Sequence, residues 1–256
     1  MKNPLDQFKR LLVKLTRTGA VVRVDTRQRR VALTFDDGPS PEYTPRLLDI
    51  LDRHGARATF FMVGEVAARY RELVAEVAAR GHVIGNHSWS HHSFPTLSRR
   101  QRREEIRRCA EMLSPYEQPL FRPPFGHQSL LSRLDPLWAG YEVICWNVLA
   151  SDWRDLPSEE LLKRLTGRVR PGNIILLHDA LFTAEREAYL DRTPTLQAVD
   201  RLLAGHPDFE FVTVPELMDS GRVVRQPWFR VGDSQWLEGL MRREVSHLGA
   251  DTQKPP

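Results

Sequence analysis

The sequence is poor in cysteine, because its 256 residues contain only Cys109 and Cys145. Two isolated cysteines do not make a disulfide framework, and the absence of a Cys-x-x-Cys pair excludes the common thiolate zinc motifs. We therefore expect two buried or partly buried free thiols, a content that fits a reducing compartment.

Long apolar runs are also lacking. No stretch of about 18 apolar residues is present, which argues against a membrane-spanning helix. The first residues, MKNPLDQFKRLLVKLTRTG, have neither the apolar core nor the small-residue cleavage site of a secretory signal. There is no glycine-rich phosphate loop, which disfavours nucleotide binding, and no repeat or low-complexity linker divides the chain. On this basis we expect a cytoplasmic protein.

Positive charge is concentrated at the N-terminus. The whole chain has a net charge of +4, whereas residues 1–30 contain nine lysines and arginines against two aspartates. Within this segment Leu5, Phe8, Leu12 and Leu15 recur at helical spacing. Two interpretations stay open. Residues 1–20 contact an anionic membrane surface at the inner face of the membrane, or they form a short helix packed on the body of the protein.

A second basic run, LSRRQRREEIRRCAEML, covers residues 97–113. Ser98 followed by Gln101 is a capping-box pattern, and acidic residues precede arginines at helix-pairing distances. No recognised nucleic-acid module accompanies the run. We interpret it as the solvated face of a helix and predict no nucleic-acid partner.

Apolar strands alternate with amphipathic helices through most of the chain. The predicted strands are 31–35, 58–64, 83–86, a short one before 120–126, 141–148, 173–178 and 209–214, and the predicted helices are 44–55, 65–81, 98–113, 158–165 and 195–206. This alternation is typical of a parallel α/β protein. About seven β/α units suit a barrel or an incomplete barrel better than an open sheet.

Polar clusters lie at or just after the ends of these strands. They are TFDDGP (34–39), NHSWSH (86–91), FRPPFG (121–126), SDW (151–153) and LLHD (176–179). Because the C-terminal ends of parallel strands share one face, where ligands bind, we expect the five clusters to form a single site.

Two histidines in the second cluster have the spacing of metal ligands. His87 and His91 stand four positions apart, so on a helical turn both imidazoles would face one ion. Together with Asp36 and Asp37 they describe a site of two histidines and one carboxylate, with the second carboxylate left as a base. Taken alone, an Asp-Gly pair is more often explained by an aspartate that holds the turn. His92 is expected to point away from the ion, to a supporting or surface position.

Arg122 and His178 are two further candidates. An arginine at a strand end can orient a carboxylate through a bidentate pair, although a structural role stays open. A histidine that ends an apolar strand can serve as a general acid, because its pKa lies in a useful range. The alternative for His178 is a buried structural histidine.

Taken in chain order, the five clusters resemble the motifs of the polysaccharide deacetylase family, carbohydrate esterase family four. The family motifs TFDDGP, H-S/T-x-x-H, R-x-P-F/Y, D-x-x-D-W and L-x-H read here as TFDDGP, HSWSH, RPPF, LASDW and LLH. The resemblance implies a distorted, incomplete (β/α) barrel. On this ground we expect a basic N-terminal segment at 1–29, a deacetylase catalytic domain at 30–217, and a C-terminal appendage and tail at 218–256.

The resemblance also implies a role for each motif residue. Asp37, His87 and His91 would hold a divalent metal, usually zinc. Asp36 would be the base for the attacking water, and His178 the acid that protonates the leaving amine.

Further motif residues would support these groups or contact the substrate. Arg122 would orient Asp36, and Asp152 would pair with His178. The residues implied at the substrate are Phe125, whose backbone N–H would stabilise the oxyanion, Trp153, and Leu176, which would line the acyl pocket.

One position departs from the family pattern. Leu149 stands where the fourth motif usually begins with aspartate, whereas Asp152 and Trp153 are present. We therefore expect catalysis to be retained but the groove wall near Leu149 to be less polar. For this reason we do not assign any one polymer substrate of the family to this protein.

The resemblance thus implies a metal-dependent hydrolase that removes an N-acetyl group from an amino sugar in a glycan or glycan precursor. Nothing in the motifs distinguishes this activity from that of an O-acetyl esterase of the xylan type. A non-catalytic saccharide-binding relative is a further alternative. The basic N-terminus and cytoplasmic start favour a lipid-linked or nucleotide-linked precursor over a secreted oligo- or polysaccharide.

Overall fold

Eight parallel strands form the central sheet of the protein in a computed structural model that describes residues 19–226 and 228. Seven of them follow the order β6-β5-β4-β3-β2-β8-β7, and β9 pairs with β2 beside this path. The strands are β2 (Arg30–Asp36), β3 (Thr59–Met62), β4 (Val83–Asn86), β5 (Glu117–Phe121), β6 (Glu142–Val143), β7 (Val148–Leu149), β8 (Ile174–His178) and β9 (Glu210–Val212).

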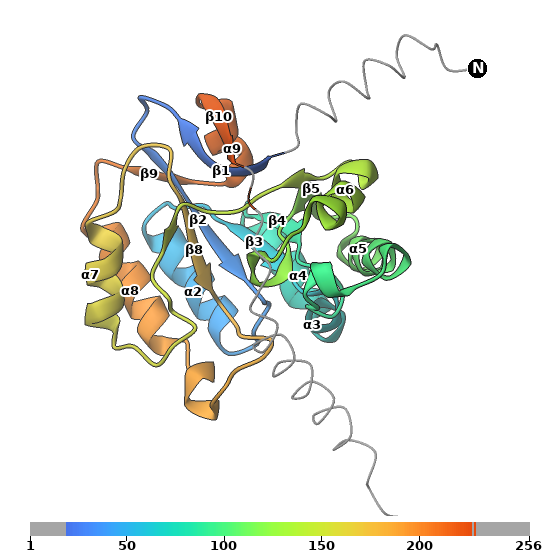
Figure 1. Cartoon of the computed structure of the whole chain (residues 1–256). Helices are drawn as coiled ribbons and strands as arrows, with labels where there is room; N and C mark the ends of the chain where they lie inside the picture. Colours follow the sequence, from blue (N-terminus) through green and yellow to red (C-terminus); the bar gives the residue numbers. More distant parts are fainter. Residues whose placement is uncertain (1–18, 227, 229–256) are drawn as a thin grey trace, which may run out of the picture.

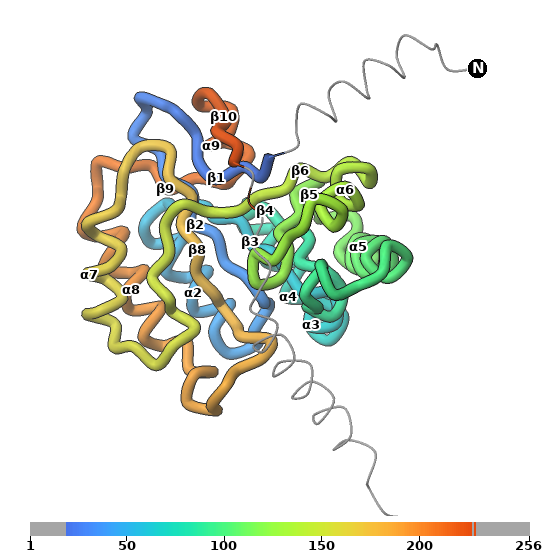
Figure 2. Tube along the Cα trace, in the orientation of Figure 1, coloured from blue at the N-terminus to red at the C-terminus, as the bar shows by residue number. Residues whose placement is uncertain are grey.

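The sheet curls into a half-barrel whose two outer strands, β6 and β7, lie at opposite ends of the strand order. Residues 144–147 cross from one of these strands to the other, so this part of the wall is a connecting segment rather than a paired strand (Figure 2). The predicted fold, an incomplete (β/α) barrel of about seven strands, is therefore confirmed.

Helices cover the outside of the curled sheet (Figure 1). They are α2 (Tyr43–Arg53), α3 (Gly64–Arg69), α4 (Arg71–Ala79), α5 (Arg99–Leu113), α6 (Leu130–Ala139), α7 (Ser158–Thr166), α8 (Thr193–Ala204) and α9 (Val214–Asp219), with short 3-10 turns η1 (Phe94–Thr96), η2 (Pro124–Gly126) and η3 (Glu187–Leu190). The larger core lies between helices and sheet, where Phe35, Leu47 and Phe60 are fully buried. Burial of these apolar faces is the main force that holds the helices on the strands.

Two predicted elements are divided in the structure. The predicted helix 65–81 breaks at Tyr70, whose φ of −129° and ψ of 50° are not helical. The predicted strand 141–148 becomes β6 and β7, because Ile144 leaves the sheet edge and bridges to Val21 across the opening. The capping box of Ser98 and Gln101 is present at the start of α5, as predicted.

Strand β1 (Ala20–Asp25) pairs antiparallel with β10 (Arg222–Gln226), and neither strand was expected from the sequence. β1 supports the open side of the half-barrel, since the Cys145 N–H donates to the Val21 carbonyl at 2.7 Å. Cys109 and Cys145 are buried free thiols, as predicted.

The amphipathic pattern of the basic N-terminus falls on residues 1–18, and most of the predicted C-terminal tail on 229–256; both lie outside the described residues. Within the described part of the chain, no helix combines the length and apolar character needed to cross a membrane.

Candidate active site

The C-terminal ends of the strands bring the five polar clusters together. Asp36 ends β2 and His178 ends β8, and these two residues are directly opposed in the paired strands. His87 follows β4, and Arg122 follows β5, the next strand in the sheet. The contacts between Asp36, Asp37, His87 and Arg122, described below, confirm that these clusters meet on one face.

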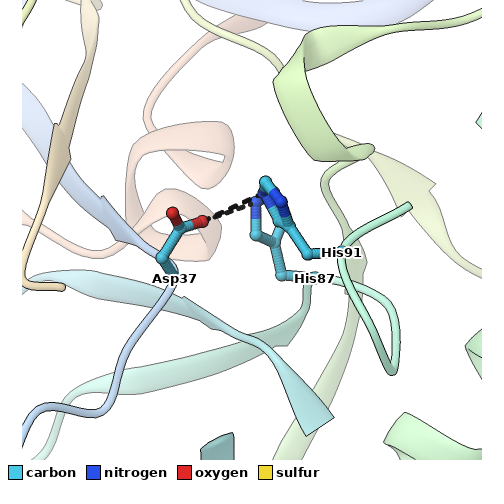
Figure 3. Close-up of side chains that lie close together, drawn as sticks. All are labelled: Asp37, His87 and His91. Atoms are coloured by element: carbon cyan, nitrogen blue, oxygen red, sulfur yellow. Dashed lines mark ion pairs between the residues drawn. The ribbon is translucent and has the colours of Figure 1, made fainter. Parts of the chain in front are cut away.

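Asp37, His87 and His91 form a compact group of three potential ligands (Figure 3). Asp37 Oδ1 lies 3.3 Å from His87 Nε2 and 3.1 Å from His91 Nε2, and all three side chains are buried. One ligand atom from each residue lies within 4.8 Å of the others. Two imidazole nitrogens and one carboxylate oxygen are a donor set that divalent metals such as zinc accept.

The hydrogen bonds around this group fit a cation. The Nδ1 atom of His87 lies 2.8 Å from the Arg122 carbonyl oxygen, which can only accept, so Nδ1 carries the proton and Nε2 turns a lone pair toward Asp37. Asp37 Oδ1 is itself buried with no hydrogen-bond partner among the described residues. When Nε2 is unprotonated, as it must be in a metal ligand, two electron-pair donors face each other, an arrangement that a bound cation satisfies.

Asp37 is ready to act as an anionic ligand. In the metal-free protein, burial alone would raise the pKa of its carboxyl group, but the charge interaction with His91 and hydrogen bonds from His87 and His91 outweigh that effect and hold the pKa well below its usual value. The Asp37 carboxyl group is therefore ionised at neutral pH. Its second oxygen, Oδ2, accepts a hydrogen bond of 3.0 Å from the backbone N–H of Phe182.

The expectation that His87 and His91 share a helical turn is wrong. Residues 87–93 form a loop, in which Ser88 has a φ of 68° and His91 a φ of 56°. These left-handed residues bend the loop so that both Nε2 atoms still reach Asp37. His92 lies outside this group, with its Nδ1 atom 2.7 Å from the Ser90 hydroxyl.

Arg122 holds Asp36 from inside the barrel. Its Nη1 atom donates to Asp36 Oδ1 and to Thr34 Oγ1, both at 2.7 Å, so it contacts the carboxylate through one nitrogen rather than through the expected bidentate pair. The Nη2 and Nε atoms donate instead to the carbonyls of Cys145 and Ile144, at 3.2 and 3.3 Å. The other carboxylate oxygen of Asp36 lies 3.7 Å from His87 Nε2, next to the ligand group.

His178 and Asp152 form a second buried pair. Asp152 Oδ1 lies 3.0 Å from His178 Nδ1, and Asp152 Oδ2 accepts the His178 backbone N–H at 2.8 Å. Burial would lower the pKa of His178, but the charge and hydrogen bond of Asp152, with smaller contributions from Asp37 and Asp36, raise it to about 9. The imidazole therefore carries a proton at neutral pH, as a general acid must.

Aromatic and apolar side chains line the site. The Phe125 ring lies 4.5 Å from the His91 ring, and the Trp153 ring lies edge-on at 5.7 Å from the His178 ring. Leu176 and Leu149 are directly opposed on neighbouring strands β8 and β7, so their side chains lie on the same face. The position that departs from the family pattern thus extends the apolar surface of Leu176.

Comparisons with known proteins identify the family. Residues 23–144 match polysaccharide deacetylase. A peptidoglycan-N-acetylglucosamine deacetylase of Bacillus cereus is 33% identical over 212 residues, covering 80% of this chain and 96% of that protein. The chain belongs to the polysaccharide deacetylase family. A second such deacetylase of B. cereus is 37% identical over 154 residues, which are 58% of this chain and only 55% of that relative's length.

A solved structure of this family has the same fold. It is a peptidoglycan N-acetylglucosamine deacetylase in complex with a naphthalenyl-N-oxidanyl-benzamide, and it superposes with a TM-score of 0.71 at 29% identity. The match covers 79% of this chain and 94% of that one.

The site of this deacetylase-family protein also contains groups that the sequence did not reveal. Arg192, fully buried, donates to the Asp152 carbonyl at 2.6 Å and to the carbonyls of Tyr189 and Leu190. It thereby fastens η3 to the Asp152 turn, where Ser151 has a φ of 60°. A lone arginine before a helix carries no sequence signal of this role, and a backbone N–H such as that of Phe182 carries none at all.

Proposed function

We propose that the protein is a divalent-metal-dependent deacetylase that removes the N-acetyl group from an amino sugar in a glycan or glycan precursor. The observation that carries this proposal is the convergence of three groups at one end of the barrel. They are the Asp37–His87–His91 ligand group, the Asp36–Arg122 pair and the Asp152–His178 pair. Membership of the polysaccharide deacetylase family supports the same conclusion.

Asp37, His87 and His91 would hold the cation, for which we propose zinc because of the nitrogen-rich donor set. When bound, such an ion supplies a Lewis acid that polarises the amide carbonyl and acidifies water. Asp36, fixed by Arg122 and placed beside the ligands, accepts the proton of the attacking water. His178, kept protonated by Asp152, donates a proton to the leaving amine nitrogen.

Three further residues complete the proposed site. The backbone N–H of Phe125 would stabilise the negative charge that develops on the carbonyl oxygen. Trp153 and Leu176 would bound the space for the acetyl methyl group, next to the rings and strands described above. Leu149 beside Leu176 favours an apolar wall at this point, in agreement with a small acyl group.

Acetate release tests the proposal. The purified protein is incubated with N-acetylglucosamine oligomers, with peptidoglycan and with acetylated xylan, before and after removal of metal by a chelator and after addition of zinc. We expect acetate from an N-acetylated substrate, its loss on chelation and its recovery with zinc. The Asp36→Asn variant should bind zinc normally but release acetate at least about a hundredfold more slowly.

Other results would contradict specific parts of the proposal. Activity that a chelator does not affect would exclude the metal-dependent mechanism. Release from acetylated xylan alone would assign an O-acetyl esterase, and zinc binding without turnover on any substrate would leave a saccharide-binding relative.

A further inference from the structure

We infer that Glu105, on helix α5, is a positioning residue that holds the loop between the two histidine ligands and thereby sets the affinity of the site for its metal. This inference rests on the proposed function, because it concerns the same ligand group. Glu105 lies outside all five motifs and touches none of the three ligand side chains in any contact described above. Its action would therefore pass through the loop backbone.

The Glu105 carboxylate accepts three hydrogen bonds from the loop. Its Oε2 atom accepts the backbone N–H groups of Trp89 at 3.0 Å and Ser90 at 2.8 Å, and its Oε1 atom accepts the Ser90 hydroxyl at 2.8 Å. Bonds from N–H and O–H donors to a charged acceptor are stronger than those between neutral groups. One side chain thus holds two of the three residues between His87 and His91.

The same segment is held from the opposite side by α3. The Gly64 and Glu65 N–H groups donate to the carbonyls of Ser88 at 3.0 Å and Trp89 at 2.9 Å. The Trp89 ring lies so close to Gly64 that a Cβ added there would come within 2.5 Å of it. The loop carbonyls therefore bond to α3 and the loop N–H groups to Glu105, so the loop is clamped between two helices.

The clamp opposes backbone strain. Ser88 and His91 both have positive φ, a conformation that costs a non-glycine residue on the order of 1–3 kcal/mol and persists only where surrounding contacts enforce it. A hydrogen bond of 3.0 Å from the His91 N–H to Ser88 Oγ provides part of that enforcement. Glu105 provides the contacts between these two strained positions. Without it, the loop is expected to relax and His91 Nε2 to leave Asp37.

Helix α5 is a rigid support for this carboxylate. Ile106, the next residue, is buried, and its carbonyl accepts a bond of 3.1 Å from Asn86, which directly precedes the ligand His87. The Arg108 guanidinium lies 4.1 Å above the Trp89 ring. The helix therefore contacts both the strand before His87 and the loop after it, and Glu105 lies directly before the first of these two contacts.

The test is the zinc affinity of the metal-free protein, measured by competition with a chromophoric chelator. Glu105→Ala removes all three bonds and should weaken zinc binding by about 10- to 100-fold, the usual effect of losing a group that orients ligands. Glu105→Asp keeps the charge but withdraws it by one methylene, so it should lose a similar factor. Glu105→Gln lacks the charge but retains an acceptor for both N–H groups and a donor for the Ser90 hydroxyl, so zinc should bind within about threefold of wild type.

The neighbouring residue supplies matched controls. Glu104 is on the exposed face of α5, where it pairs with Arg107, and Glu104→Ala, Glu104→Asp and Glu104→Gln should leave zinc affinity unchanged. A Glu105→Asp variant that binds zinc more tightly than Glu105→Gln would show that charge attraction, not position, is what matters. Unchanged affinity in both variants would overturn the inference. If Glu105→Ala does not fold, the zinc affinities of Glu105→Asp and Glu105→Gln still test the inference.

These outcomes are distinct from a failure of the proposed function. A wild-type protein that binds no zinc would contradict the proposed function itself. A wild-type protein that binds zinc and releases acetate, with a Glu105→Asp variant of equal affinity, would contradict only the role of Glu105. A purely structural role would lower the thermal midpoint of the metal-free protein but leave the zinc dissociation constant unchanged.

Discussion

Replacement of Arg122 by methionine should destabilise the folded protein more than replacement of its partner Asp36 by asparagine. Arg122 is fully buried and donates to Asp36, to the Thr34 hydroxyl and to two backbone carbonyls. Methionine fills much of the same space but donates no hydrogen bond. The variant therefore leaves the Asp36 carboxylate buried and without its cation.

The magnitude follows from this uncompensated charge. Removal of one partner from a buried ion pair costs about 3–5 kcal/mol, a large part of the stability of a domain of this size. The two carbonyls, of Ile144 and Cys145, lie in the segment that crosses the barrel opening and lose their donors as well. Urea unfolding of the metal-free protein at pH 7 should show a midpoint lower by about 2 M.

A double variant tests the reasoning by the sign of its effect. If the buried charge is the cause, Asp36→Asn added to Arg122→Met removes that charge and should raise the free energy of unfolding above that of Arg122→Met alone. Additive losses from the two substitutions would refute this explanation. A loss below about 1 kcal/mol in Arg122→Met would show that water or another cation already compensates Asp36.

Two further predictions concern pH. In Asp152→Asn, His178 loses the main contribution that raises its pKa to about 9, while burial still lowers that pKa. The acid then loses its proton at a lower pH, so the alkaline limb of kcat/KM should move to lower pH. An unmoved limb would exclude His178 as the acid. Burial lowers the pKa of His82 to about 4, so below about pH 6.5 the unfolded chain gains a proton that the folded chain does not, and the folded state loses stability. The free energy of unfolding in urea should therefore fall by up to about 3 kcal/mol between pH 7 and pH 4 from this group. The fall should be smaller in His82→Asn, whose side-chain oxygen can still accept the Ala58 N–H.

The sequence allowed most strands of the parallel sheet, and the grouping of polar residues at their ends, to be predicted, because both follow from local rules. Strands such as Ile174–His178 are apolar runs that end in polar residues, and parallel topology places those ends on one face. The resemblance to the family then assigned a role to each polar residue. These inferences require no knowledge of how distant segments contact each other.

What could not be predicted depends on such contacts. The conformation of the loop from His87 to His91 is imposed by Glu105 and α3, which lie elsewhere in the chain, so its spacing suggested a helical turn that does not form. The division of the predicted strand at Ile144 reflects its bridge to Val21, more than a hundred residues earlier. Arg192 supports Asp152 by bonding to a backbone carbonyl, a contact that leaves no pattern in the sequence.

Adjacent carboxylates in Asp36–Asp37 would repel each other if they shared one environment, yet both lie buried in this site. The backbone separates them. Asp36 continues the extended strand and reaches Arg122 inside the barrel, whereas Asp37 has a φ of 73° and turns to the two histidines at the rim. Each carboxylate thus has its own partners, Arg122 for Asp36 and the two histidines for Asp37, and only one oxygen of Asp36 comes near the ligand group, 3.7 Å from His87 Nε2. The proposed distinction between base and ligand therefore rests on backbone conformation, because the two side chains are chemically identical.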